Sequence, residues 1–96
     1  PDTTDRPCVV YSIGSNGQYD FEEAVSQQTK CRIETFDCTV DEDRLPTHLR
    51  DRVRFHKICL GSPSESDGGL KFMTLKSIMA MLGHSYVTLL KADIEG

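Results

Sequence analysis

Tryptophan is absent from this sequence, and no apolar run comes near the length of a membrane-spanning segment. A helix needs about 20 consecutive apolar residues to cross a bilayer, so we expect no membrane span in this chain. Positive charge is also scarce, because 11 Lys and Arg residues stand against 15 Asp and Glu residues and leave a net charge of −4. General nucleic-acid binders depend on neutralising phosphates. The charge balance therefore argues against nucleic acid as a partner.

With 96 residues, the chain has the size of one small domain. Its first segment, 1–7, is polar, contains two prolines and is expected to form a flexible lead-in. The first residue is Pro rather than Met, and the last four residues directly follow an apolar segment. We therefore expect residues 1–96 to be a single nucleotide-binding α/β domain that is part of a longer protein.

Hydrophobic patterning predicts strands that alternate with helices. Short apolar runs rich in β-branched residues indicate buried strands, and apolar residues at helical spacing indicate amphipathic helices. The expected strands are 8–13, 31–37, 52–60 and 86–94, with a short extended segment at 70–73, and the expected helices are 20–28 and 74–82. This order predicts a Rossmann-like parallel sheet with right-handed crossovers and the strand order 3-2-1-4.

Side-chain patterns add finer expectations about these elements. Asp20 would cap the first helix, and Ala24 would be among the residues that face the sheet. Thr74 would cap the second helix, and Gly83 would end it. The strand 86–94 is almost continuously apolar, which is typical of a strand covered on both faces.

The four cysteines contain no Cys-x-x-Cys pair, and Cys31 and Cys38 lack the spacing of a common zinc site, so we expect no metal site. Cys8 and Cys31 would open neighbouring strands, and Cys38 and Cys59 would close neighbouring strands, which lie within disulfide reach. Two bridges, Cys8–Cys31 and Cys38–Cys59, are one expectation and would fit the secretory pathway. Four free thiols that act as small hydrophobic residues are the other, and would fit a cytoplasmic protein.

A small polar turn, Gly14-Ser15-Asn16-Gly17, separates the first strand from the first helix. Glycines at such a position let backbone N–H groups approach an anionic or polar ligand, although any tight turn can also use Asn-Gly. Asp37 lies 23 residues after Gly14, at the end of the second strand, where a carboxylate can accept hydrogen bonds from a ribose diol. The alternative for Asp37 is a turn or cap. Together the two features favour a ligand that contains adenosine.

The one basic region has two interpretations, a solvated surface between helix and strand or a site for an anionic substrate. It comprises Arg44, Arg50, Arg52, Arg54, His56 and Lys57. His56 and His84 rank low as catalytic residues, because one lies in an expected strand and the other directly before one.

Several segments together resemble the S-adenosylmethionine-dependent methyltransferases of the FkbM and methyltransferase-like type. The closing Leu-Leu-Lys-x-Asp-x-Glu-Gly pattern is the most specific match. The segments that carry the resemblance are Val10–Gly17, Phe21–Glu22, Thr35–Asp37, Met73–Leu75 and Leu89–Gly96. The resemblance implies a truncated class I methyltransferase fold, of which this chain would be the cofactor-binding half.

The resemblance also implies a cofactor, S-adenosyl-L-methionine, and a role for each matching position. The turn would lie under the methionine part of the cofactor, the acid after the second strand would hold the ribose, and the residues after the third strand would lie near the adenine. The implied cofactor-binding residues are Ser12, Gly14, Ser15, Asn16, Gly17, Asp37, Gly61 and Ser62. The implied catalytic residues are Asp93 and Glu95. Ser12 departs from the family pattern, because such enzymes often carry an acidic residue there.

The implied reaction is methyl transfer to an acceptor, with a hydroxyl of a small molecule or glycan as one option. Two alternatives remain open at this point. One is a nonenzymatic Rossmann-like domain that binds a cofactor or a protein, and the other is part of an NAD-dependent oxidoreductase, against which the missing third glycine counts. An uncovered sheet edge beside the last strand would also favour self-association.

Overall fold

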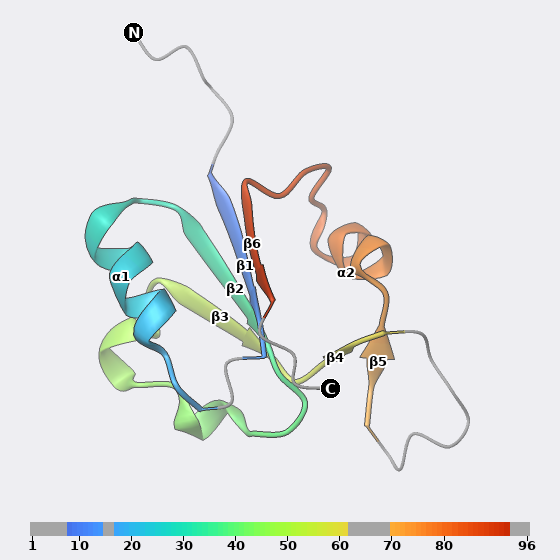
Figure 1. Cartoon of the computed structure of the whole chain (residues 1–96), viewed down its shortest axis with the longest axis horizontal. Helices are drawn as coiled ribbons and strands as arrows, with labels where there is room; N and C mark the ends of the chain where they lie inside the picture. The colour runs from blue at the N-terminus through green and yellow to red at the C-terminus, as the bar shows by residue number, and fades with distance from the viewer. Residues whose placement is uncertain (1–7, 15–16, 62–69, 93–96) are drawn as a thin grey trace, which may run out of the picture.

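The computed structural model describes residues 8–14, 17–61 and 70–92, and its centre is a parallel four-stranded sheet (Figure 1). The strands are β1 (Val9–Ile13), β2 (Arg32–Phe36), β3 (Val53–His56) and β6 (Leu89–Ala92), and they lie in the order β3-β2-β1-β6. All three pairings are parallel. The predicted α/β class and strand order are therefore confirmed for the main sheet.

Helices cover the two faces of this sheet. Figure 1 shows α1 (Asp20–Gln28) on one side and α2 (Leu75–Leu82) on the other. Two short 3₁₀ helices, η1 (Glu42–Arg44) and η2 (Thr47–Leu49), lie between β2 and β3. All five residues of β1 are buried. The first strand is thus the centre of the fold.

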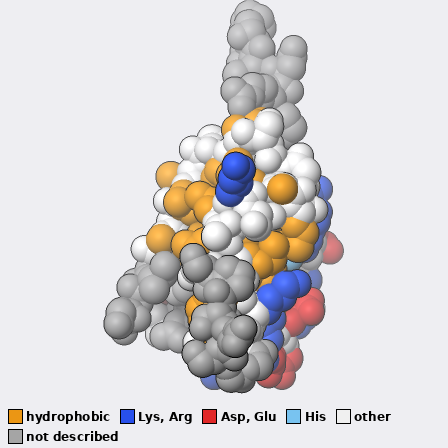
Figure 2. Space-filling model, turned by 90° about the vertical axis from the view of Figure 1, so that its right-hand side faces the viewer, with side chains coloured by type: hydrophobic (Ala, Val, Ile, Leu, Met, Phe, Trp, Pro, Cys, Tyr) orange, Lys and Arg blue, Asp and Glu red, His pale blue; other side chains and the backbone are white. Residues whose placement is uncertain are grey.

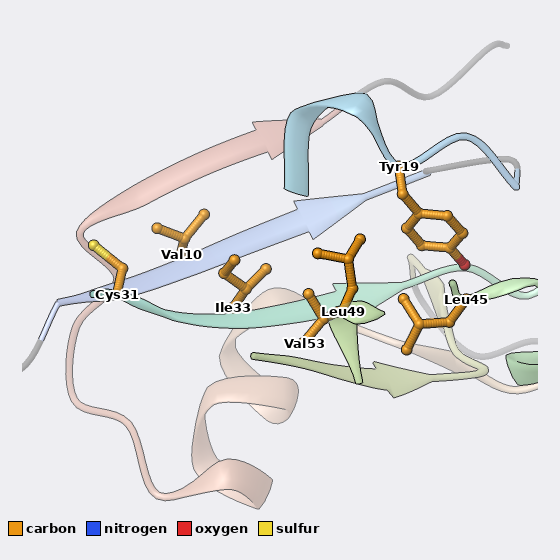
Figure 3. Close-up of a cluster of buried hydrophobic side chains, with 7 residues drawn as sticks. All are labelled: Val10, Tyr19, Cys31, Ile33, Leu45, Leu49 and Val53. Carbon is orange, nitrogen blue, oxygen red and sulfur yellow. The ribbon is translucent and has the colours of Figure 1, made fainter. Parts of the chain in front are cut away.

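Two hydrophobic clusters form the core because successive strand residues point to opposite faces. The first cluster, shown in Figure 3, lies on the α1 side and consists of Val10, Tyr19, Cys31, Ile33, Leu45, Leu49 and Val53. The second cluster includes Ile78 of α2 and consists of Val9, Tyr11, Ile13, Phe36, Ile58 and Ile78.

The caps of the helices were predicted well for α2 and poorly for α1. Thr74 accepts a hydrogen bond from the Ser77 backbone N–H, and Gly83 ends the helix in the left-handed conformation with φ of 77°. Asp20 is instead the first residue of α1 and makes no capping bond. Ala24 is exposed, so its predicted position facing the sheet is wrong. The buried residue of α1 is Glu22, whose carboxylate accepts a hydrogen bond from a hydroxyl of the sheet.

The predicted third strand divides into two. β3 ends at His56, and a hydrogen bond of 2.9 Å from the Ile58 N–H to the His56 carbonyl turns the chain out of the main sheet. The following strand, β4 (Cys59–Leu60), pairs in parallel with β5 (Phe72–Met73) as a separate small sheet.

The predicted burial of the last strand on both faces is wrong. β6 is shorter than expected, and Leu89 and Leu90 are 49% and 44% exposed. Its only neighbour among the described residues is β1, so β6 is an edge strand whose apolar side chains stay partly uncovered. Hydrophobic side chains also form much of the molecular face seen in Figure 2.

Two disulfides join the elements at both ends of β2. Cys8–Cys31 links the starts of β1 and β2, with 4.6 Å between the Cα atoms. Cys38–Cys59 links the segment after β2 to β4, with a Cα separation of 4.9 Å. All four cysteines are bridged. Of the two expectations for the cysteines, the structure has the disulfides.

Most of the basic region binds groups of the protein itself. The Arg52 guanidinium donates to the Ser26, Thr29 and Cys31 carbonyls at 2.9–3.0 Å and so joins the end of α1 to the start of β2. Arg54 lies near the Glu34 carboxylate, and Lys57 pairs with the Asp41 carboxylate. These contacts favour a structural role over an anionic-substrate site.

Candidate functional site

The turn after β1 and the acid after β2 lie at the same edge of the sheet. Because the two strands are parallel, their carboxyl ends meet at one rim. The Gly14 N–H donates to the Phe36 carbonyl at 2.9 Å, so the turn starts against the residue that precedes Asp37. Gly14 has φ of 85°, a conformation that favours glycine. The structure thus brings together the turn and the acid.

The far side of the turn is close to the segment that follows Asp37. A Cβ atom added to Gly17 would lie 3.9 Å from both Val40 Cγ1 and Arg44 Cζ. Gly17 also has φ of 81°, so a side chain there would be strained. The turn and the connection after β2 therefore form two sides of one rim.

Asp37 is buried and its orientation is fixed by a local turn. The residue is only 6% exposed. Its Oδ1 atom accepts hydrogen bonds from the Thr39 N–H at 2.8 Å and from the Thr39 hydroxyl at 2.6 Å. This is an Asx-type turn, the alternative that the sequence left open. The same bonds also hold the carboxylate in place at the rim.

Gly61 directly follows β4 of the small sheet and lies outside the main sheet. Its N–H donates to the Met73 carbonyl at 2.9 Å, and a Cβ atom at this position would come within 3.2 Å of the Phe72 ring. The Cys38–Cys59 disulfide ties this segment to the residue after Asp37. The remaining predicted site residues, Ser15, Asn16, Ser62, Asp93 and Glu95, lie outside the described residues.

Two buried polar side chains lie just inside the rim on the α1 side. Ser12 and Glu22 are both fully buried, and Glu22 Oε2 accepts a hydrogen bond from the Thr35 hydroxyl at 2.8 Å. Within the described part of the chain, Ser12 Oγ and Glu22 Oε1 have no hydrogen-bond partner. Sequence reasoning missed Glu22 because apolar spacing placed other residues toward the sheet. The only signal was its place in the Phe21–Glu22 match.

A second polar network lies on the α2 face of the sheet and accounts for both low-ranked histidines. His84 Nδ1 and the Tyr11 hydroxyl form a hydrogen bond of 2.6 Å. His56 Nε2 lies 2.7 Å from Glu34 Oε1 and its ring stacks on Phe36. Burial, and secondly the negative charge of Glu34, raise the pKa of Tyr11 to about 12. These contacts give the network a structural role.

The shifted pKa of Tyr11 predicts a loss of stability at alkaline pH. The folded protein holds this proton more tightly than the unfolded chain, whose tyrosine pKa is 10.0, so the stabilisation is complete below pH 10 and disappears as the pH rises towards 12. The two pKa values correspond to about 2–3 kcal/mol. Urea unfolding at pH 9 and at pH 12 would measure the loss. The Tyr11→Phe variant should lose less stability than the wild type between pH 9 and pH 12. An equal loss in this variant would contradict the role of the Tyr11 proton.

The described ranges 8–14, 17–61 and 70–92 show neither a metal centre nor a membrane span. These ranges hold no group of three or more His, Cys, Asp or Glu residues placed to bind a metal ion. None of their helices has the length and apolar character of a membrane span.

Comparison with known proteins gives one match, and it covers nearly the whole chain. A family model described as a methyltransferase domain matches residues 2–96. No curated protein and no solved structure matched. The parallel α/β sheet is consistent with this family. The chain therefore belongs to the methyltransferase domain family.

Proposed function

We propose that this chain binds S-adenosyl-L-methionine as the cofactor-binding half of a methyltransferase. The observation that carries the proposal is the hydrogen bond from the Gly14 N–H to the Phe36 carbonyl, which sets the glycine turn beside Asp37. Backbone N–H groups of such a turn can bind the charged tail of a nucleoside, and a carboxylate can bind its ribose. Ser12 Oγ, which has no hydrogen-bond partner among the described residues, also fits a site that a ligand completes.

The proposal assigns the rim residues to the parts of the cofactor. Ser12 and the turn would hold the methionine part, Asp37 the ribose, and the segment after β4 the adenine. The full set is Ser12, Gly14, Ser15, Asn16, Gly17, Asp37, Gly61 and Ser62. The cofactor supplies a methyl group already activated on its sulfonium, so the protein contributes binding and orientation. Asp93 or Glu95 would accept the proton of a hydroxyl acceptor.

The acceptor and the assembly state extend the proposal. We assign the acceptor to the class of small molecules or glycan-like molecules. Leu89 and Leu90, exposed on the edge strand β6, support self-association through this edge, because unpaired strand edges with apolar side chains pair readily. Family membership in the methyltransferases counts against an NAD-dependent oxidoreductase.

Asp37→Ala is expected to weaken cofactor binding by about 1–3 kcal/mol, because a buried carboxylate that binds the ribose would be lost. Isothermal titration of the wild type and the variant with S-adenosylmethionine and S-adenosylhomocysteine would measure the change. Asp41→Ala is the matched control, since Asp41 is an exposed acid on the same connection. Unchanged affinity in Asp37→Ala would remove this residue from the site.

The titration also separates the proposal from its alternatives. Binding of the two sulfur cofactors but not of NAD is the expected result. Cofactor binding without methyl transfer to any offered acceptor would indicate a nonenzymatic domain. A wild-type chain that binds neither sulfur cofactor would contradict the proposed function.

A further inference from the structure

The buried carboxylate of Glu22 is an unusual feature of α1. It is the one buried residue of this helix, and within the described ranges its Oε1 atom has no hydrogen-bond partner. No ion pair to Glu22 occurs among the described residues either. Burying a carboxylate oxygen without a partner is costly, and native proteins contain few such groups. A group of this kind is expected to have a partner that the chain alone does not provide.

The location of Glu22 points to the cofactor rim. Thr35 holds Glu22 Oε2 with its hydroxyl at 2.8 Å, and Thr35 is the register partner of Ser12 on the neighbouring strand. Register partners project from the same face of a sheet, so the two unpartnered atoms, Ser12 Oγ and Glu22 Oε1, lie on the same face near the carboxyl ends of β1 and β2. Gly14, which starts the turn, follows Ser12 by two residues.

The nearby cation is already engaged elsewhere. Lys91 pairs in register with Ser12, but its Nζ atom lies over the Phe21 ring, 5.7 Å from the ring centre. The site therefore offers a carboxylate oxygen and a hydroxyl to a positively charged donor. A primary ammonium group, which has three N–H donors, matches this pair of acceptors.

We propose that Glu22, together with Ser12, binds the α-ammonium group of the amino-acid part of the cofactor, directly or through one ordered water. This inference rests on the proposed function and names the ligand chemistry of the α1 side of that site. In this arrangement α1 would supply the carboxylate and β1 the hydroxyl.

The test compares two nucleosides that differ in the amino-acid part. S-adenosylhomocysteine carries the ammonium group, whereas 5′-methylthioadenosine keeps the adenosine and the thioether but has no amino-acid part. Glu22→Gln keeps the size of the side chain and removes its charge. We expect Glu22→Gln to weaken the binding of S-adenosylhomocysteine roughly ten- to hundredfold. The binding of 5′-methylthioadenosine should weaken less than twofold, as measured by isothermal titration. Asp37→Ala should weaken the binding of both nucleosides.

Glu23→Gln is the matched control, because Glu23 is the next residue of α1 and bonds to His48 at the surface. It should leave both affinities unchanged. Equal weakening of the two nucleosides by Glu22→Gln, or no weakening, would overturn the inference and leave the proposed function standing. A wild-type chain that binds neither nucleoside would overturn both.

Circular dichroism would show whether Glu22→Gln folds. If it does not fold, a measurement on the wild type tests the inference instead. The probe is the analogue of S-adenosylhomocysteine in which hydrogen replaces the α-amino group. A tenfold or greater loss of affinity for this analogue supports a bound ammonium group. Equal affinity for the analogue and for S-adenosylhomocysteine would overturn the inference.

Discussion

Replacing Cys38 and Cys59 with serine is expected to lower the free energy of unfolding by about 3 kcal/mol. The bridge closes a loop between residues 21 positions apart, and the chain-entropy treatment of such a loop gives roughly this value. The same change should also weaken the binding of S-adenosylhomocysteine, because Cys38 follows Asp37 and Cys59 lies two residues before Gly61. Urea unfolding and isothermal titration would measure the two effects separately.

The other disulfide provides a control of almost equal size. Cys8–Cys31 spans 23 positions and lies at the opposite end of β2, away from the rim. Its replacement by serine should therefore cost about the same stability, roughly 3 kcal/mol, with little change in affinity at a temperature where both variants are folded. Equal loss of affinity in the two variants would show that the Cys38–Cys59 bridge has no special part in the site.

Loss of both bridges should remove a large share of the stability of the fold. A domain of this length is expected to have a total stability of roughly 5–14 kcal/mol, and the two bridges together contribute about 6 kcal/mol. Strong reductant should therefore lower the urea midpoint sharply in the wild type.

Arg52→Ala is expected to destabilise the protein by about 3 kcal/mol, the second large effect. Three carbonyl groups would lose a charged donor, and each such bond contributes about 1.5–3 kcal/mol before exposure and non-additivity reduce the sum. The last turn of α1 has no basic residue of its own, so Arg52 supplies the positive charge that favours a helix C-terminus. Urea unfolding at pH 7 would measure the change.

Two further variants sharpen this prediction. Arg52→Lys should recover less than half of the loss, because a single ammonium group cannot reproduce the planar fork of the guanidinium. Arg50→Ala should cost less than about 1 kcal/mol, since Arg50 is exposed and its longer bonds, 3.2–3.3 Å, go to carbonyls of its own connection. A loss in Arg50→Ala as large as that in Arg52→Ala would contradict the assigned role of Arg52.

Local signals in the sequence predicted the elements that depend on neighbours in the chain. Thr74 and Gly83 mark the ends of α2 through bonds to residues one turn away, so their types alone indicate the boundaries. The parallel sheet followed from the alternation of strands and helices, because helical crossovers between strands allow only a few sheet topologies. The meeting of the Gly14 turn with the Asp37 segment follows from that topology.

The features that could not be predicted depend on distant parts of the chain. Nothing near Arg52 in the sequence shows that its guanidinium reaches carbonyls more than 20 residues upstream. Glu22 faces the sheet and bonds to Thr35, 13 residues away, and apolar periodicity cannot find a buried carboxylate. The apolar sequence of β6 resembles that of a covered strand, because composition does not tell what packs against a face.

The arrangement of the two disulfides has a consequence for biosynthesis. Four cysteines allow three pairings, and this protein uses the one in which each bridge joins consecutive cysteines, 8 with 31 and 38 with 59. The first pair is complete before the third cysteine has been made. In an oxidising compartment, a chain that enters N-terminus first can thus form its native bridges in order, without reshuffling by an isomerase.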